Sequence, residues 1–226
     1  MGTLSVVATP IGNLGDITLR AIETLRQADV IACEDTRVTA KLLQKYDIEK
    51  PLFIYHARSG RLNTTRILEA LGEGKRVALV TDAGTPGISD PGAELVAEVR
   101  DRLDGDVTIE AIAGPAAITA ALSITGIPCA DFTFLGFLPH KKGRETLFKE
   151  IAAAKRAYVF YESPHRLTKA LASLTKVLDD KRLVAVCREL TKIHESVIRG
   201  SAADVEKHFK LHPDQVRGEV VIIVGP

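Results

Sequence analysis

The chain has 226 residues, of which 46% are hydrophobic and 26% are charged, and this composition is ordinary for a globular protein. At roughly 100–200 residues per domain, the length allows one large domain or two small ones. No apolar run approaches the ~20 residues that a membrane-spanning helix needs. The first residues lack a basic leader and a cleavage site, so we expect a cytoplasmic protein.

The net charge of +1 is unevenly distributed along the chain. Residues 1–115 contain 13 Lys/Arg and 17 Asp/Glu, whereas residues 116–226 contain 17 Lys/Arg and 12 Asp/Glu. A basic second half could bind a polyanion, but a solvated helix face explains so mild an excess about as well. Charge alone therefore does not identify a nucleic-acid-binding protein.

The three cysteines, Cys33, Cys129 and Cys187, lie far apart and form no Cys-x-x-Cys pair. We expect buried thiols in place of a disulfide framework or a zinc site. No cluster of His, Cys and Asp has metal-ligand spacing, so the sequence predicts no metal.

In the first half of the chain, short apolar runs rich in β-branched residues alternate with segments of helical periodicity. The predicted strands are residues 4–8, 30–33, 52–55, 77–80 and 107–112. The predicted helices are residues 18–27, 36–46, 63–71, with Asn63 as a cap, and 93–103. Such alternation indicates a mainly parallel sheet with helices on both faces.

The strand pattern restarts after a Gly/Pro break at residues 125–128, near which we place a domain boundary, giving domains 1–118 and 119–226. Strands are then predicted at 132–137, 157–161, 183–189, 196–199 and 219–224. Helices are predicted at 116–124, 143–154, 164–178 and 202–209. Two successive strands after residue 183 have no helix between them, which favours antiparallel pairing and hence a mixed second sheet.

The strongest local signal is the segment 81–92, which reads Thr-Asp-Ala-Gly-Thr-Pro-Gly-Ile-Ser-Asp-Pro-Gly. It follows a predicted strand and precedes a predicted helix, which is where open α/β sheets bind ligands. The alternative is a plain strand–helix turn with Ser89 or Asp90 as N-cap, although such a turn needs only ~2–6 residues. No Gly-Lys-Ser/Thr follows, so a P-loop is excluded. Pro10 removes a backbone donor after the first strand, which disfavours a nicotinamide site.

Seven strings occur in the order that is typical of one family. They are Val-Ala-Thr-Pro-Ile-Gly-Asn-Leu-Gly-Asp-Ile-Thr (7–18), Cys-Glu-Asp-Thr-Arg (33–37), the segment 81–92, Gly-Pro-Ala-Ala (114–117), Tyr-Glu-Ser-Pro-His-Arg (161–166), Arg-Glu-Leu-Thr-Lys (188–192) and Gly-Glu-Val (218–220). Together they resemble bacterial ribosomal RNA small subunit methyltransferase I, a branch of the tetrapyrrole methylase superfamily. The resemblance covers essentially the whole chain.

The resemblance implies the two-domain α/β fold of the tetrapyrrole methylases (class III SAM methyltransferases), with a mainly parallel N-terminal sheet and a mixed C-terminal sheet. It also implies S-adenosyl-L-methionine as cofactor, bound in the cleft between the domains, and a homodimer. The residues implied to line the cofactor site are Pro10, Gly84, Thr85, Pro86, Gly87, Ile88, Ala116, Ala117, Tyr161, Leu190, Gly218 and Val220.

The implied reaction is methylation of the ribose 2′-hydroxyl of a cytidine in the decoding region of 16S rRNA, within the small ribosomal subunit. The hydroxyl must lose a proton, so a nearby base would assist. The candidates are Glu34, Asp35, Glu162, His165, Glu189 and Glu195. Each has a structural alternative: Glu34 and Asp35 as helix caps, His165 as a surface residue, Glu189 in a salt bridge with Arg188 or Lys192.

Arginines at Arg37, Arg166 and Arg188 could hold the RNA backbone. After His56 the sequence departs from the family's usual His-Glu-His-Asn-Glu, but Arg58 and Arg61 in this segment suit phosphate. Aromatic content is only 5%, so we expect RNA binding to depend on Arg, Lys and RNA shape. Relatives usually continue into a small helical tail beyond Pro226.

Two rival hypotheses stay open at this point. The first keeps the fold and cofactor but makes the substrate a small tetrapyrrole. The second is a non-catalytic, ribosome-associated or nucleotide-binding α/β protein, in which the Gly/Pro loops would be structural only.

Overall fold

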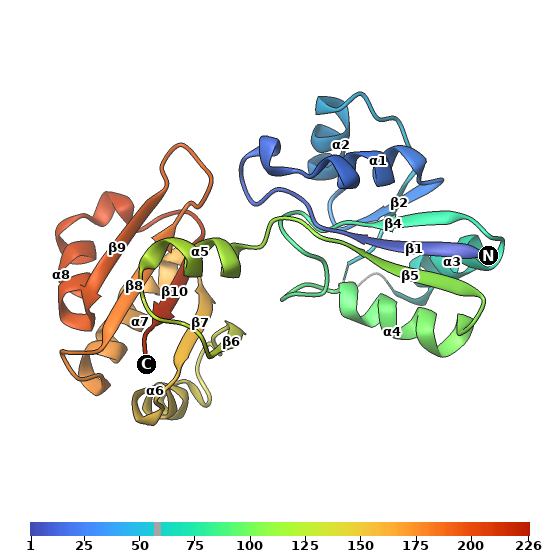
Figure 1. Cartoon of the computed structure of the whole chain (residues 1–226). Coiled ribbons are helices and arrows are strands. Elements are labelled where there is room, and N and C mark those ends of the chain that lie inside the picture. The colour runs from blue at the N-terminus through green and yellow to red at the C-terminus, as the bar shows by residue number, and fades with distance from the viewer. Residues whose placement is uncertain (57–59) are drawn as a thin grey trace. The chain divides into compact units, whose positions relative to one another are not determined.

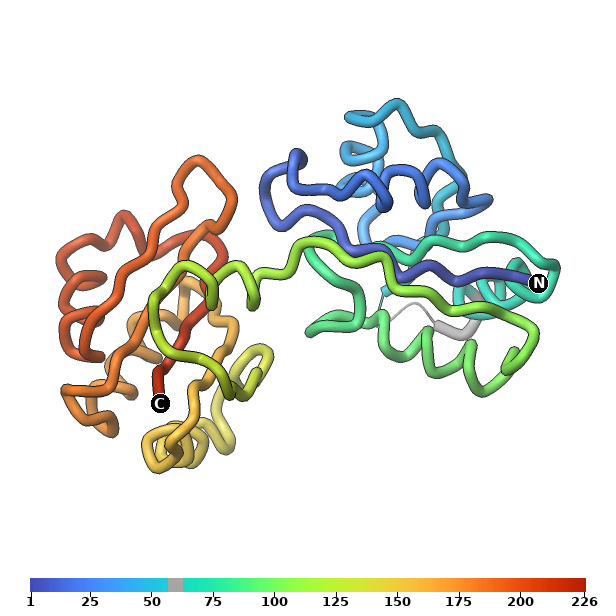
Figure 2. Tube along the Cα trace, viewed as in Figure 1, coloured from blue at the N-terminus to red at the C-terminus, as the bar shows by residue number. Residues whose placement is uncertain are grey.

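A computed structural model describes the chain apart from residues 57–59, and apart from the side chains of residues 60–62 (Figure 1). The chain divides into two compact units, Met1–Ala116 and Ala117–Pro226. Each unit is built on a five-stranded sheet of its own. Figure 2 follows the backbone through the first unit, coloured blue to green, and then through the second, coloured yellow to red.

The sheet of the first unit is parallel throughout, with strand order β3-β2-β4-β1-β5. Its strands are β1 (Gly2–Val7), β2 (Val30–Cys33), β3 (Leu52–Ile54), β4 (Arg76–Leu79) and β5 (Val107–Ile112). Parallel strands carry helices on both faces, which explains why β2 is buried along its entire length. The predicted mainly parallel sheet is confirmed.

Two helices cover each face of this sheet. The helices are α1 (Leu19–Gln27), α2 (Thr36–Lys45), α3 (Gly60–Gly72) and α4 (Gly92–Leu103), and a short 3-10 turn, η1 (Leu14–Asp16), precedes α1. Leu25 of α1 and Leu42 of α2 belong to one apolar cluster, whereas Leu71 of α3 and Leu95 of α4 belong to another. The predicted cap at Asn63 is wrong, because α3 already begins at Gly60.

The sheet of the second unit is mixed, with strand order β6-β7-β10-β8-β9. Its strands are β6 (Phe132–Phe137), β7 (Ala157–Glu162), β8 (Leu183–Arg188), β9 (Ser196–Ser201) and β10 (Val220–Val224). The outer strand β6 pairs parallel with β7, and the other neighbours pair antiparallel. The predicted antiparallel pairing of the two strands after residue 183 is confirmed.

Helices cover the two faces of the second sheet unequally. The helices are α5 (Ala117–Thr125), α6 (Arg144–Ala153), α7 (Pro164–Val177) and α8 (Ala202–Leu211), and a 3-10 turn, η2 (Pro213–Gln215), leads into β10. Phe148, Leu171 and Phe209 from α6, α7 and α8 share one core with Phe160 and Ile222 of the sheet. On the opposite face α5 packs against β8, β9 and β10 (Figure 1).

Cys33 and Cys187 are buried and free, as predicted from their apolar surroundings, and Cys129 is half-buried. Burial raises the pKa of the Cys33 and Cys129 thiols, and it raises the pKa of Cys187 to about 12. Among the described residues, no helix combines the length and apolar character needed to cross a bilayer.

The buried thiols lead to a labelling prediction. Because the reagent must reach the thiolate, iodoacetamide at mildly alkaline pH should alkylate the half-buried Cys129 in the native protein and spare the buried Cys33 and Cys187, as read by peptide mass spectrometry. In guanidinium chloride all three should react. Native labelling of Cys187 as fast as Cys129 would contradict the buried placement.

Candidate functional site

The first unit contains a topological switch point between β1 and β4. These strands are neighbours in the sheet, but β1 leads to α1 on one face and β4 leads to α4 on the other. The loops after the two strands therefore diverge at the carboxyl edge of the sheet. This is the position at which open α/β sheets bind their ligands.

Hydrogen bonds join three loops at this edge. The amide of Thr9 donates to the carbonyl of Gly84 over 2.8 Å, and the amide of Gly84 donates back to Thr9 over 3.1 Å. The hydroxyl of Thr85 donates to the carbonyl of Pro115 over 3.2 Å. The loops that carry Pro10, Gly84–Ile88 and Ala116, all expected to line the cofactor site, are thus held side by side.

The segment 81–92 is a fixed loop and not a simple turn. Gly84 and Gly87 have φ of +86° and +85°, a region that favours glycine. The carboxylate of Asp90 accepts hydrogen bonds from the amides of Gly87 and Gly92. A Cβ on Gly92 would lie 2.7 Å from the nitrogen of Gly87. The alternative with Ser89 or Asp90 as N-cap is wrong, because Pro91 occupies the N-cap position of α4.

Asp35, at the end of β2, is occupied as a helix cap. Its carboxylate accepts from the amide of Arg37 over 2.8 Å and forms an ion pair of 2.6 Å with the Arg37 guanidinium. The hydrogen bond from the Arg37 side chain is the main reason why the pKa of Asp35 falls to about 2. The capping interpretation is confirmed for Asp35, and so weakly basic a carboxylate is a poor proton acceptor.

Glu34 lies beside Asp35 in a different environment. It is half-buried, and the hydroxyl of Thr81 donates to its Oε2 over 3.4 Å. Burial raises the pKa of Glu34, and the nearby carboxylates of Asp82 and Asp90 raise it further. Of these two adjacent carboxylates, Glu34 has the greater affinity for a proton.

In the second unit, the expected cofactor residues collect at one edge of the sheet. Val220, the first residue of β10, pairs with Glu162 at the end of β7 and with Arg188 at the end of β8. Tyr161 precedes Glu162, and Leu190 follows Arg188 by two residues. The antiparallel pairing of β10 with both neighbours therefore gathers residues that lie far apart in the sequence.

Glu189 is the centre of a polar network at this edge. Its Oε1 accepts from the amide of Glu219 over 2.8 Å and from Nζ of Lys192 over 3.0 Å. Burial alone would raise the pKa of Glu189, but the Glu219 amide and Lys192 outweigh it and lower the pKa. Glu189 and Thr191 adopt positive φ of 51° and 67°, and Leu190 between them is buried. The salt bridge with Lys192 is confirmed, and Glu189 holds a strained turn.

Glu162, a further candidate base, is buried between two arginines. Its Oε2 lies 2.5 Å from Nη2 of Arg144, and its Oε1 lies 2.7 Å from Nη2 of Arg166. The amide of Ser163 also donates to Oε1. Both carboxylate oxygens of Glu162 are thus engaged by side chains or a backbone amide of the chain itself. These contacts give Glu162 a structural role as the centre of a buried ion-pair network, and its part in catalysis stays a prediction.

The arginines expected to contact RNA are placed differently from one another. Arg188 is buried, and its guanidinium donates to Ser196 Oγ and to the carbonyl of His194. Arg166 forms an ion pair with Glu162, so Arg166 and Arg188 both make contacts within the chain, and their contact with RNA stays a prediction. Arg37 is exposed beside Asp35. Arg58 lies outside the described residues, and the side chain of Arg61 is not described.

The two remaining base candidates lie at the surface. His165 is exposed in the first turn of α7, which matches the surface interpretation. Glu195 is exposed as well, and its Oε2 accepts from the amide of Thr191 over 2.6 Å. Ser163 occupies the N-cap position of α7 but makes no side-chain capping bond.

Residues 3–206 match the family model for tetrapyrrole (corrin/porphyrin) methylases. A Thermotoga maritima protein named ribosomal RNA small subunit methyltransferase I is 43% identical over 226 residues, which cover 100% of this chain and 99% of that protein. The chain belongs to the tetrapyrrole methylases, in this ribosomal RNA methyltransferase branch.

A protein of the same name from Synechocystis sp. is 44% identical, and the match covers 100% of this chain and 79% of that protein. The tetrapyrrole methylase fold is also that of uroporphyrin-III C-methyltransferase from Thermus thermophilus, solved in complex with S-adenyl homocysteine. The TM-score between the two structures is 0.66 at 18% sequence identity, and the match covers 99% of this chain and 97% of that one. The α/β fold expected from the motifs is confirmed.

Sequence reasoning missed three residues that organise the strand edges of the two units. Thr9 bridges to Gly84, Asp90 fixes the loop from within, and Arg144 neutralises Glu162. Asp90 could have been found, since an Asp before Pro-Gly commonly accepts from nearby amides. Arg144 could not, because no periodicity relates it to a residue 18 positions further along the chain.

The turn that holds Glu189 predicts a specific requirement for glycine at Gly218, where φ is +81°. A Cβ at this position would overlap the Glu189 carboxylate, whereas a Cβ on Gly105, with φ of +82°, meets nothing within 4 Å. Gly105→Ala should cost about 1–2 kcal/mol for the left-handed backbone. Gly218→Ala should lower the free energy of unfolding by roughly 2 kcal/mol more than Gly105→Ala does, because it also displaces the Glu189 carboxylate from the Glu219 amide. Urea denaturation measures both, and equal losses would contradict the packing.

Proposed function

We propose that the chain is an S-adenosyl-L-methionine-dependent methyltransferase that methylates the ribose 2′-hydroxyl of a cytidine in the decoding region of 16S rRNA, within the small ribosomal subunit. The observation that carries the proposal is 43% identity across the full chain to a protein named ribosomal RNA small subunit methyltransferase I. We further propose that the protein acts in the cytoplasm as a homodimer. The expected position of the cofactor between the two domains stays a prediction.

The residues at the carboxyl edge of the first sheet fit the proposed donor. Adenosylmethionine has no phosphate, and the loop 81–92 contains no lysine or arginine. It offers backbone groups instead, at Gly84, Gly87 and Ser89, whose positive φ values turn the chain sharply. Ile88 is 46% exposed and can cover an apolar ring. Tight loops with convergent backbone groups and an apolar side chain suit a small amphiphilic ligand.

When bound, the donor supplies a methyl group on a positively charged sulfur. With the donor bound, the methyl group would pass from this sulfur to the ribose oxygen, and a residue of the chain would have to accept the hydroxyl proton. Loops fixed by hydrogen bonds to one another would serve to hold the reactants in line, and such positioning can supply much of the acceleration. Among the candidates we assign the proton to the Glu34 carboxylate. Asp35, Glu162 and Glu189 each form an ion pair with a cation of this chain, and His165 and Glu195 lie exposed at the surface of the second unit.

Methyl transfer from tritiated donor tests the activity. Small subunits from cells that lack this modification should take up label, and the label should be recovered in a 2′-O-methylated cytidine. Transfer to a precorrin-type tetrapyrrole with none to the subunit would support the tetrapyrrole alternative. No donor binding in calorimetry at millimolar concentration would support a non-catalytic protein. Either result contradicts the proposal.

The raised pKa of Glu34 predicts a pH dependence. Because the ionised form accepts the proton, kcat/KM should fall as pH drops through a pKa above the ordinary glutamate value of 4.5. Glu34→Gln should remove this acidic limb and lower kcat about 10²–10⁴-fold. A carboxyl group whose pKa is raised in the folded state lowers the free energy of unfolding at pH values above that pKa, where it is ionised. Glu34→Gln removes this ionisation, so the substitution should not lower Tm at neutral pH.

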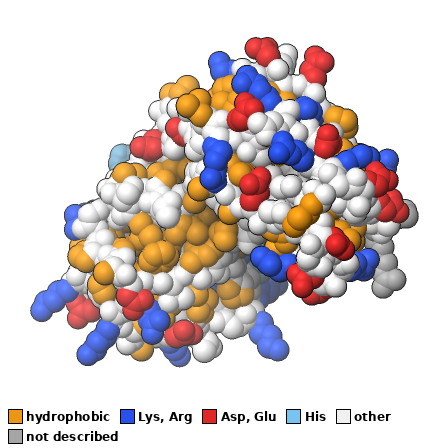
Figure 3. Space-filling model, turned by 45° about the vertical axis from the view of Figure 1, so that its right-hand side comes forward, with side chains coloured by type: hydrophobic (Ala, Val, Ile, Leu, Met, Phe, Trp, Pro, Cys, Tyr) orange, Lys and Arg blue, Asp and Glu red, His pale blue; other side chains and the backbone are white. Residues whose placement is uncertain are grey.

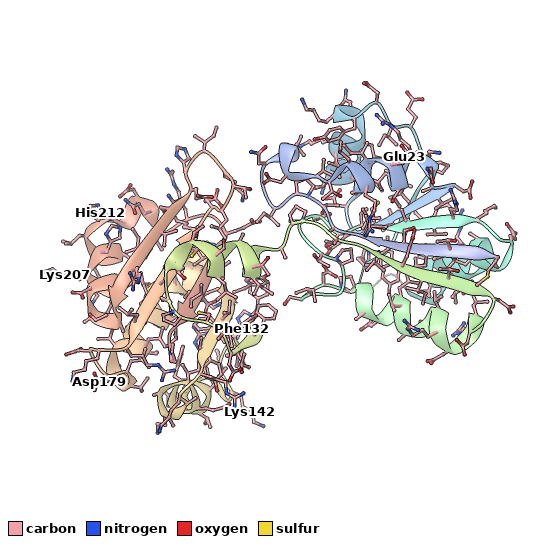
Figure 4. All side chains as sticks on the ribbon, viewed as in Figure 1. Glu23, Phe132, Lys142, Asp179, Lys207 and His212 are labelled. Atoms are coloured by element: carbon pink, nitrogen blue, oxygen red, sulfur yellow. The ribbon has the colours of Figure 1, made fainter. Side chains whose placement is uncertain are left out.

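Glu23→Gln on α1 is the matched control, since Glu23 is near Thr3 and Ser5 of β1, away from the carboxyl edge (Figure 4). It should leave the pH profile unchanged. If Glu34→Gln keeps the acidic limb, or if His165→Asn abolishes it, the assignment of Glu34 as the base is wrong.

A further inference from the structure

Three aromatic rings form a cluster on β6 and β7 that no sequence pattern indicated. The ring of Tyr161 lies 5.1 Å from Phe134 and 5.3 Å from Phe137, between ring centroids. We call these three residues the aromatic platform. Phe134 and Tyr161 are half-buried, whereas Phe137 is 57% exposed. A large aromatic ring so exposed, and supported by a second ring beneath, is typical of a binding surface.

A bulge in β6 creates this arrangement. Successive side chains of a strand alternate between faces, so Phe134 and Phe137 would ordinarily point to opposite sides. The register with β7 shifts between these two residues, and Gly136 has φ of +61°. The extra residue brings both rings onto Tyr161, in the way that bulges commonly re-aim side chains near functional sites.

The chain that leaves the platform is basic and exposed. His140, Lys141 and Lys142 follow within five residues of Phe137 and are all exposed. In the part of the chain that the structure describes, neither lysine forms an ion pair. Figure 4 marks Lys142 at the surface of the second unit, and Figure 3 shows hydrophobic side chains gathered on this unit with Lys and Arg around them.

The buried ion pairs of Glu162 hold this segment in place. Arg166 donates from Nη1 to the carbonyl of Leu138 over 3.0 Å, and Arg144 donates from Nη1 to the carbonyl of Pro139 over 3.1 Å. Leu138 itself is buried in the core. Two successive backbone carbonyls directly after Phe137 are thus fixed by guanidinium groups, so the ring and the lysines are presented on a rigid support.

We propose that the aromatic platform and the following lysines bind a single-stranded segment of the substrate RNA. An unpaired base stacks on the exposed face of Phe137, and Lys141 and Lys142 contact the adjacent phosphates. Stacking on an aromatic ring beside a cationic track is the usual way to hold unpaired nucleotides. The proposal rests on the proposed function, and it adds RNA contacts on exposed side chains to those expected at Arg166 and Arg188, which are mostly buried.

The charge of the segment favours RNA over a second copy of this chain. A homodimer contact would bury Lys141 and Lys142, and burying a charge without a partner is costly. A polyanion provides that partner along its whole length. The ring stacks on any base, because every base presents a π face, so sequence preference is expected to come from elsewhere.

Fluorescence anisotropy with a labelled single-stranded oligoribonucleotide tests the stacking contact. Phe137→Ala should weaken binding about tenfold or more, and Phe137→Trp should keep it. Phe132→Ala is the matched control, since Phe132 is 40% exposed but lies at the other end of β6, outside the platform. It should bind as the wild type does.

The salt dependence of RNA binding tests the lysines. Removing one lysine–phosphate ion pair should reduce the slope of log K against log salt by about 0.7 on a single strand. Lys141→Ala and Lys142→Ala should each show this reduction, whereas Lys207→Ala on α8 should not. An unchanged slope in both variants overturns the assignment of phosphates to this segment.

Three further outcomes overturn the inference. In the first, Phe137→Ala binds RNA and methylates the subunit as the wild type does. In the second, Phe137→Ala loses affinity for the donor in calorimetry, which would make the ring part of the cofactor site. In the third, Phe137→Ala converts a dimer to a monomer in light scattering, which would make the ring a contact between copies. These outcomes differ from a failure of the proposed function, because in that case the wild-type protein itself would methylate no ribosomal substrate.

Discussion

The direction of the strands is the constraint on which the site depends. In the first unit all five strands run parallel, so every loop that follows a strand lies at the same edge of the sheet. The backbone bridge between Thr9 and Gly84 then joins the two loops that diverge at the switch point. In the second unit β10 runs against its neighbours, and its first residue meets the ends of β7 and β8. In each unit, residues with positive φ, such as Gly84 in the first and Glu189 in the second, therefore lie at one edge of the sheet.

Carboxylates at these edges divide into two kinds by their partners. Glu162 and Glu189 are held by cations and amides, so they support the loops after β6 and β8. Glu34 has a hydroxyl and neighbouring carboxylates instead, and its pKa is raised by burial and by them. The first kind supplies rigidity, and the second has the raised proton affinity that we require of the proposed base. Residue type alone does not separate them, because all three are glutamates at strand ends.

Most of the fold could be predicted from periodicity, whereas side-chain partners could not. The strands 107–112 and 132–137 were predicted at their observed bounds, because apolar runs flanked by polar turns mark them clearly. The helix start at Asn63 was wrong because a capping residue type also occurs inside helices. The bulge at Gly136 and the pairing of Arg144 with Glu162 depend on tertiary packing. The aromatic platform went unseen for the same reason, since low aromatic content says nothing about clustering.

Hydrogen exchange read by mass spectrometry, with and without adenosylmethionine, tests most directly whether the strand edges form the donor site. The account predicts slower exchange in the segments 8–16, 81–92, 188–195 and 216–220 when the donor is present. The turns at the opposite edges, 72–75 and 104–106, should exchange at unchanged rates. Protection at those turns, or no protection in the loop 81–92, would contradict the placement of the donor at the strand edges.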